Sequence, residues 1–236
     1  MIERQFSLDD QMRFAELSGD SNPMHVDPMV ARRLMFGAPV VHGASLVLWA
    51  LESLVEDPQR IAALKIQFGH AVLVGKRVGL SKVDRGTSKV RLSVLLDGAA
   101  VSTIDVEFGE CVATDAPATS RDSRQSPRLW TRDDVENAAG EFALGVAAGI
   151  AAADYPRLWR LAPDLVATIA RASYLVGMEC PGEHSIFSSM KLLRKAPPAR
   201  ASDTLRWRVA SFDDRFSRVA MLGETAAASI EIAAFL

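Results

Sequence analysis

The sequence has few of the residues from which metal centres and disulfide frameworks are built. Only two cysteines, Cys111 and Cys180, and four histidines occur among the 236 residues. No spacing among them matches a metal site, and this cysteine usage is typical of a reduced, cytosolic protein. We therefore expect no metal, and we expect the protein to be cytoplasmic.

Long apolar runs and an excess of charge of either sign are also missing. The most apolar stretches are interrupted by proline, glycine or charge before they reach the length that crosses a bilayer, and residues 1–5 lack the apolar core of a secretory signal. The formal net charge is −2, from 27 basic and 29 acidic residues. This balance gives no electrostatic basis for binding nucleic acid or an anionic membrane, so we expect neither as a partner.

The most informative segment is the decapeptide of residues 18–27, Ser-Gly-Asp-Ser-Asn-Pro-Met-His-Val-Asp. It places a carboxylate, Asp20, five residues before an imidazole, His25. Pro23 fixes its own φ angle and disfavours helix at Asn22, while Gly19 tolerates a left-handed backbone. The segment therefore predicts a loop that orients two titratable side chains.

Apolar periodicity predicts helices first and an antiparallel sheet afterwards. A Ser-x-x-Asp cap signal opens a helix at Ser7 that ends at Gly19, and Asp27-Pro28 starts another that runs to about Leu34. Residues 43–55 are apolar on nearly every side, which is typical of a fully buried helix. Strand patterns follow at 63–73, 77–83, 89–95 and 101–111.

The same order recurs after a polar, proline-bearing segment, 114–128, that reads as a linker. The second part has a helical signal at 132–153, a second apolar helix at 163–176 and strands near 205–209, 218–222 and 228–235. We interpret the chain as two diverged copies of one unit, residues 1–113 and 129–236. Only the first copy carries the decapeptide.

The decapeptide, together with Phe36-Gly-Ala-Pro-Val-Val-His-Gly43 and the apolar helix, resembles the MaoC-like (R)-specific enoyl-CoA hydratases and dehydratases. That resemblance implies an α+β fold, a tandem or double hotdog, in which each half has a long buried helix wrapped by a curled antiparallel sheet. Residues 1–113 would be the catalytic hotdog. Residues 129–236 would be a degenerate second hotdog without a site of its own.

The resemblance also implies roles for individual residues. Asp20 and His25 would be the catalytic pair that holds the reacting water, and the backbone N–H of Gly43 would bind the thioester carbonyl. Asn22 would hold the loop or assist the site. We expect His42 to be structural, with its ring helping to fix the Gly43 peptide.

The expected reaction is reversible hydration of trans-2-enoyl thioesters to (R)-3-hydroxyacyl thioesters, without a cofactor. A carboxylate and an imidazole can exchange a proton near neutral pH, and an N–H at a helix start can stabilise the developing enolate oxygen. The partner would be a small-molecule acyl thioester. The sequence does not determine the acyl chain length, whether the carrier is coenzyme A or acyl carrier protein, the direction of the reaction in the cell, or whether the protein forms homo-oligomers.

Three other functions fit the same residues. They are dehydration of a carrier-bound 3-hydroxyacyl group, a hotdog thioesterase using a carboxylate such as Glu52, and a non-catalytic subunit that binds acyl thioesters. We expect Glu52 to be a partly exposed helical residue, and His70 and His184 to be structural or on the surface. The basic residues that could meet coenzyme A phosphates, which we expect to be solvated charge, are Lys65, Lys76, Arg77, Lys82, Arg194 and Lys195.

Overall fold

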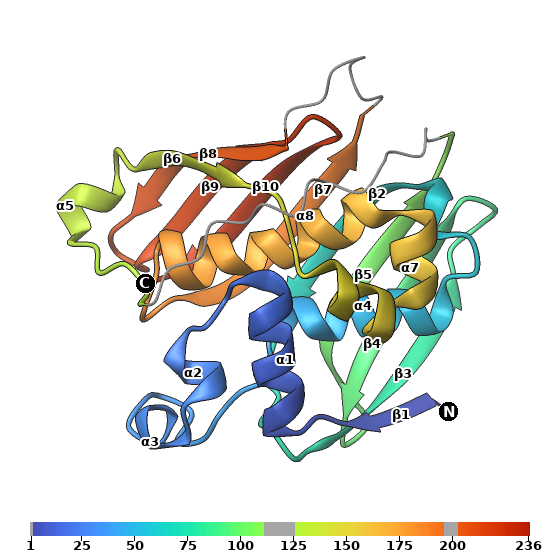
Figure 1. Cartoon of the computed structure of the whole chain (residues 1–236), viewed down its shortest axis with the longest axis horizontal. Helices are drawn as coiled ribbons and strands as arrows, with labels where there is room; N and C mark the ends of the chain where they lie inside the picture. Colours follow the sequence, from blue (N-terminus) through green and yellow to red (C-terminus); the bar gives the residue numbers. More distant parts are fainter. Residues whose placement is uncertain (1, 111–125, 196–202) are drawn as a thin grey trace.

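The computed structural model describes residues 2–110, 126–195 and 203–236. Ten antiparallel strands form one curved sheet in the order β1-β3-β4-β5-β2-β7-β10-β9-β8-β6 (Figure 1). The strands are β1 (Ile2–Gln5), β2 (Ile61–Phe68), β3 (Arg77–Asp84), β4 (Lys89–Leu96), β5 (Ala99–Phe108), β6 (Ala139–Ala143), β7 (Ile186–Arg194), β8 (Thr204–Asp213), β9 (Arg218–Glu224) and β10 (Ala228–Phe235).

The strand order reads the same from either edge of the sheet toward its middle. From one edge the order is β1-β3-β4-β5-β2, and from the other it is β6-β8-β9-β10-β7. The two orders are equivalent, because each strand of the first half corresponds to the strand numbered five higher in the second half. The two halves join where β2 pairs with β7, with Ala63 opposite Leu193 and Gln67 opposite Ser189. The fold is a double hotdog of the α+β class, as the sequence predicted.

The helices lie on one face of the sheet (Figure 1). They are α1 (Leu8–Ser18), α2 (Pro23–Val26), α3 (Pro28–Ala31), α4 (Gly43–Leu54), α5 (Arg132–Val135), α6 (Ala148–Asp154), α7 (Pro156–Leu161) and α8 (Pro163–Tyr174), with a 3-10 turn, η1 (Pro58–Arg60), and a π-helical turn, η2 (Leu175–Glu179). No helix among the described residues has both the length and the apolarity needed to cross a membrane.

Two helices, α4 and α8, form the centre of the core, one from each half. The stretch from Ala44 to Leu51 of α4 is buried throughout, and all of α8 is buried. Helices that are apolar on every side need partners on every side. Here the concave face of the sheet lies on one side of them, and α1 and α7 pack against them.

One predicted helix, at 132–153, is wrong over most of its length. The segment contains only the single turn of α5, then the edge strand β6, and then α6 from Ala148. Alanine and glutamate favour helix locally. In the structure, however, β6 pairs with β8. Gly140 packs closely against the Trp207 indole, so that a Cβ at position 140 would lie 3.1 Å from Trp207 Nε1. Tertiary packing overrides the local helical preference in this segment.

Other element boundaries differ by a few residues, and two further strands were not predicted. The helix after Asp27 ends at Ala31, and the strand expected at 63–73 ends at Phe68. Strands β1 and β7 lack clear alternation, and their positions come from pairing with β3 and with β2 and β10. Residues 114–125 of the predicted linker lie outside the described residues, and the division into 1–113 and 129–236 stays a proposal that the mirrored strand order supports.

Candidate active site

The decapeptide forms the predicted loop except at Pro23–Val26, which is the single helical turn α2, and each of its changes of direction has a local cause. Helix α1 ends at Gly19, whose φ of 81° is the left-handed conformation that glycine adopts without strain. The Asn22 side chain caps α2 by accepting from Met24 N, and Pro23 occupies its first turn. Asp27 caps α3 through the N–H groups of Met29 and Val30. Asp20 therefore lies in the turn between α1 and α2, whereas His25 lies on α2 itself.

Asp20 is buried, at 1% exposure, and its carboxylate is held from two directions. Its Oδ2 accepts a hydrogen bond from Ser173 Oγ at 2.6 Å, and its Oδ1 accepts one from the Asn22 N–H at 3.3 Å. Burial raises the pKa of Asp20, although the His25 imidazole, these hydrogen bonds and the Arg171 guanidinium oppose the rise. The carboxylate can therefore take up a proton more readily than an ordinary aspartate.

His25 is half-buried, and one of its ring nitrogens is fixed to the backbone. Its Nδ1 lies 2.8 Å from the carbonyl oxygen of Val40, and because a carbonyl only accepts, Nδ1 must be the donor. The other nitrogen, Nε2, is then the one available to the cavity. Desolvation lowers the pKa of His25, opposed by Asp20 and the Val40 bond, which favours a neutral ring with a lone pair on Nε2.

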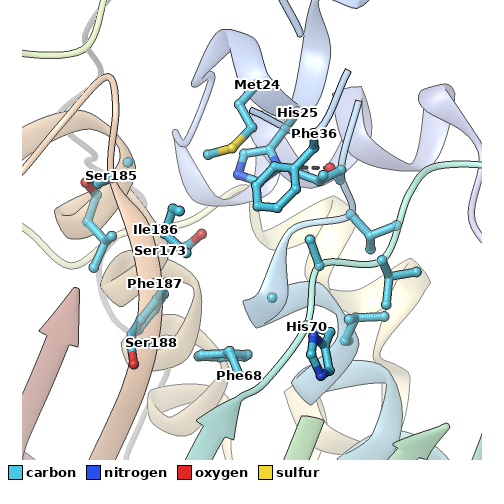
Figure 2. A pocket seen from close by; sticks show the side chains of 18 of the residues that line it. Met24, His25, Phe36, Phe68, His70, Ser173, Ser185, Ile186, Phe187 and Ser188 are labelled. Carbon is cyan, nitrogen blue, oxygen red and sulfur yellow. Dashed lines mark hydrogen bonds between the residues drawn. The ribbon is translucent and has the colours of Figure 1, made fainter. Parts of the chain in front are cut away.

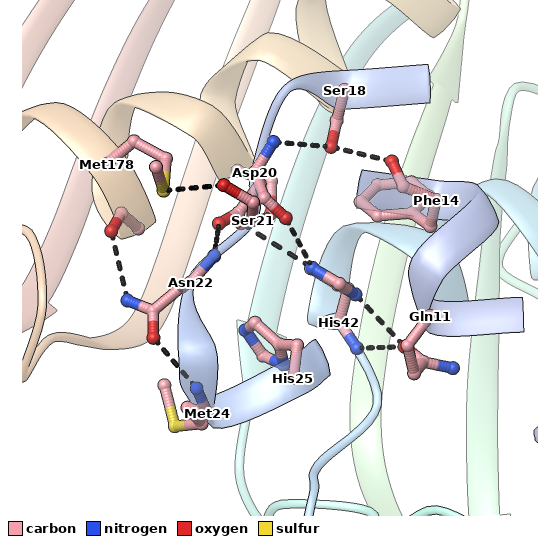
Figure 3. A network of polar contacts seen from close by, with 12 residues as sticks. Gln11, Phe14, Ser18, Asp20, Ser21, Asn22, Met24, His25, His42 and Met178 are labelled. Carbon is pink, nitrogen blue, oxygen red and sulfur yellow. Dashed lines mark hydrogen bonds and ion pairs between the residues drawn. The ribbon is translucent and has the colours of Figure 1, made fainter. Parts of the chain in front are cut away.

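His42 is fully buried behind this pair (Figure 3). Its ring stacks on that of His25 with centroids 3.8 Å apart. Its Nε2 donates to the Asp20 backbone carbonyl at 3.0 Å, and Gln11 Oε1 lies 3.0 Å from its Nδ1 and accepts from its backbone N–H. Burial and His25 lower the pKa of His42 well below its ordinary value. The ring therefore braces the Asp20 loop and the start of α4.

Gly43 begins α4 at the wall of the same cavity. The first N–H groups of a helix have no partner inside it, and they carry the positive end of the helix dipole. The ring of Phe68 lies against the Gly43 Cα, so that a Cβ there would stand 2.8 Å from Phe68 Cε1. Only glycine fits at this position without displacing Phe68.

The cavity joins these groups in a largely apolar space of about 370 Å³. Asp20, His25 and Gly43 all line it, and the remaining walls are mainly apolar side chains such as Met24, Phe36, Phe68 and Phe187 (Figure 2). Such a space suits an acyl chain that ends at a few polar groups. His70, which the sequence assigned to structure or surface, is an exposed residue at the edge of this cavity.

The second half contributes residues to this cavity that sequence reasoning missed. Ser173 on α8, Val176 and Gly177 on the π turn, and Phe187 on β7 all line it. The Phe187 ring packs against Phe68 with centroids 4.8 Å apart, across the junction of the two halves. No sequence motif marks these residues, because their relevance depends on the pairing of β2 with β7.

The polar cluster offers three atoms of metal-binding type, from Asp20, His25 and His42, within 4.8 Å of one another. The two imidazoles are stacked with 26° between ring planes and centroids 3.8 Å apart, so their lone pairs lie in two separate, nearly parallel planes and do not meet at one ion. Nε2 of His42 and Nδ1 of His25 are also engaged by backbone carbonyls. The arrangement fits hydrogen bonding to one water better than coordination of a metal.

Comparison with known proteins finds a matching domain in the amino-terminal half. The sequence profile of the MaoC-like domain matches residues 2–104. The peroxisomal hydratase-dehydrogenase-epimerase of Saccharomyces cerevisiae is 31% identical over 99 residues, which are 39% of this chain and 11% of that protein. The peroxisomal multifunctional enzyme type 2 of Drosophila melanogaster is 29% identical over 84 residues, 34% of this chain and 14% of that protein. The chain therefore spans only a small part of the curated relatives it matches.

Solved structures extend the likeness of fold to the whole chain. A MaoC-like dehydratase superposes with a TM-score of 0.61 at 13% identity, covering 98% of this chain and 95% of the other. The dehydratase domain of a mycocerosic acid synthase-like PKS superposes with a TM-score of 0.53 at 12% identity, covering 99% and 90%. Residues 2–104 therefore match the MaoC-like domain, and the whole chain shares the double-hotdog fold of these structures.

Proposed function

We propose that the protein catalyses the reversible syn addition of water to trans-2-enoyl thioesters, giving (R)-3-hydroxyacyl thioesters. The observation that carries this proposal is the meeting of Asp20 and His25 on one apolar cavity beside the start of α4. Atoms of the two side chains lie within 4.8 Å of each other, a separation that one water can bridge. Both residues belong to the domain that matches the MaoC-like family.

The reaction needs one group that accepts a proton from water and one that delivers a proton to Cα. Asp20 and His25 together meet both needs when they hold a single proton between them, whichever residue carries it. The transfer leaves the pair with the same single proton at the end of the cycle. Activity should therefore fall in acid, where both groups are protonated, and in alkali, where neither is.

The third requirement is a donor for the thioester oxygen as negative charge develops on it. The backbone N–H of Gly43 fills this role, because it stands at a helix start on the wall of the cavity. The apolar walls exclude water from the acyl chain and strengthen the hydrogen bond to the oxyanion. Coenzyme A is the thioester carrier that we propose.

The direct test is hydration of trans-2-enoyl-CoA substrates of increasing chain length by the wild-type protein. We expect loss of the enoyl absorbance, formation of the (R)-3-hydroxyacyl product by chiral analysis, and a bell-shaped pH profile. Product of (S) configuration, or no turnover of the enoyl thioester of either coenzyme A or a carrier protein, would contradict the proposal. Turnover of the carrier-protein thioester alone would keep the chemistry and replace coenzyme A as the carrier.

The thioesterase alternative depends on Glu52, and the geometry of that residue opposes it. Its carboxylate accepts hydrogen bonds from the backbone N–H groups of Arg157 and Leu158 at the start of α7, at 3.2 and 2.8 Å. It serves as a cap for α7 and lies outside the residues that line the cavity. As expected, Glu52 is a partly exposed helical residue.

Replacement Glu52→Gln tests this distinction. We expect enoyl-CoA hydration to be unchanged and thiol release to stay at background in both proteins. The free energy of unfolding should fall by about 0.3–1 kcal/mol, because the variant loses a negative charge from the start of a helix. Thiol release by the wild type that Glu52→Gln abolishes would support a thioesterase instead.

A further inference from the structure

Two residues of the second half of the chain pack closely against the Asp20 carboxylate. Ser173 in the last turn of α8 and Gly177 in the π turn are four residues apart, so they fall on the same side of the helix. Ser173 donates its hydroxyl to Asp20 Oδ2. Gly177 presents its bare Cα to the same carboxylate: a Cβ there would lie 2.8 Å from Cγ and 2.9 Å from Oδ2, and closer still to Oδ1.

The backbone of Gly177 holds the loop as well. Its carbonyl accepts a hydrogen bond from Asn22 Nδ2 at 2.9 Å, and the same amide group also lies within hydrogen-bond distance of the carbonyls of Gly182 and Glu183. Asn22 is fully buried, and its own N–H donates to Asp20 Oδ1 (Figure 3). Gly177 therefore contacts the carboxylate directly and fixes the residue that orients it.

The end of the helix explains why this carbonyl can face the loop: the last carbonyls of a helix have no partner inside it, and the residue four positions on is Pro181, which has no N–H. In the turn from Leu175 to Glu179 the N–H of Cys180 bonds to the carbonyl of Leu175, five residues back, at 2.7 Å. A π turn widens the helix and disturbs the regular pairing of its carbonyls, and such turns occur frequently at functional sites. The turn thus places a glycine and an outward carbonyl where the Asp20 loop arrives.

We propose that Gly177 is a positioning residue for the hydratase reaction: its missing side chain and its carbonyl set the place of the Asp20 carboxylate from the other half of the chain. This inference rests on the proposed function. The degenerate half thereby becomes part of the reaction centre, although it contains no loop like residues 18–27.

The first test is Gly177→Ala, with Gly149→Ala as the matched control. Gly149 lies on α6 with nothing within 4 Å of the Cβ position, so alanine fits there. We expect Gly177→Ala to lower kcat by roughly a hundredfold with little change in KM, because displacement by about 1 Å misaligns a catalytic group. Its acid limb should move to higher pH, since a displaced carboxylate loses the Ser173 bond that favours its charged form.

A double-mutant cycle of melting temperatures tests the same contact even where Gly177→Ala folds poorly. Asp20→Ala removes the carboxylate that a Cβ at 177 would meet, so Gly177→Ala should lower the melting temperature in the wild-type background and hardly at all in the Asp20→Ala background. Equal destabilisation in both backgrounds would overturn the inference. Wild-type kcat and pH profile in Gly177→Ala would also overturn it and leave the proposed function standing, whereas an inactive wild type would refute the proposed function itself.

Discussion

Asp20→Asn is expected to lower kcat/KM for enoyl-thioester hydration by about a hundredfold to ten-thousandfold, the range typical of a lost proton-transfer group. An amide can still accept the hydroxyl of Ser173, but it cannot take up or return a proton. His25 would be the only titrating group left in the pair, so the bell-shaped pH profile of the activity should lose one of its two limbs. Hydration rates across the pH range, with trans-2-enoyl-CoA as substrate, measure both effects.

The matched control is Asp27→Asn, the same substitution seven residues further along the loop. Asp27 accepts from the N–H groups of Met29 and Val30 as the cap of α3, and asparagine caps a helix as well as aspartate does. We expect wild-type activity from this variant. Equal activity in wild type and Asp20→Asn would refute the catalytic role of Asp20.

The effect of Asp20→Asn on stability should have the opposite sign to its effect on activity. Burial raises the pKa of Asp20 in the folded protein, so the folded state binds this proton more tightly than the unfolded state does. The contribution of Asp20 to stability is then fully present below its unfolded pKa, about 3.9, and is lost as the pH rises through the folded value. At pH 7 the asparagine variant should unfold at no lower a temperature than the wild type, with its relative advantage shrinking in acid.

The second large effect is expected from Arg194→Met, which should lower the free energy of unfolding by about 3–5 kcal/mol. The Arg194 and Asp164 side chains are 2% and 7% exposed and form a two-bonded ion pair at 3.0 and 3.1 Å. The guanidinium also donates to the carbonyls of Gln59 and Ile61, which joins β7 and α8 to the first half. Removing it leaves the Asp164 carboxylate buried without its partner.

Denaturant unfolding of three variants separates the causes. Arg194→Met combined with Asp164→Leu should recover much of the loss, because the unpaired charge is gone. Arg215→Met breaks the exposed ion pair with Asp213 and should cost less than about 1 kcal/mol. A loss in Arg194→Met no larger than that in Arg215→Met would show that the buried pair does not stabilise the junction.

Arg194 also shows where a residue-by-residue interpretation fails. The sequence suggested solvated charge at this position, yet the side chain is buried, because it lies on the face of β7 that α8 covers and pairs there with Asp164. The predicted helix at 132–153 fails for a related reason: the pairing of β6 with β8 is a long-range contact that local propensity does not contain. The buried helices α4 and α8 were predicted well, because a predominance of apolar residues around a helix is itself the signal of extensive burial.

The sequence by itself determined the two-unit α+β plan, the buried central helices and the loop that carries Asp20, Asn22 and His25. These features are local: proline, glycine and capping residues shape the loop within a few positions, and apolar runs identify the core. The tertiary structure alone decided what surrounds the carboxylate. Ser173 and Gly177 lie more than 150 residues from Asp20 in the chain, and only the pairing of β2 with β7 and the packing of α8 bring them to it.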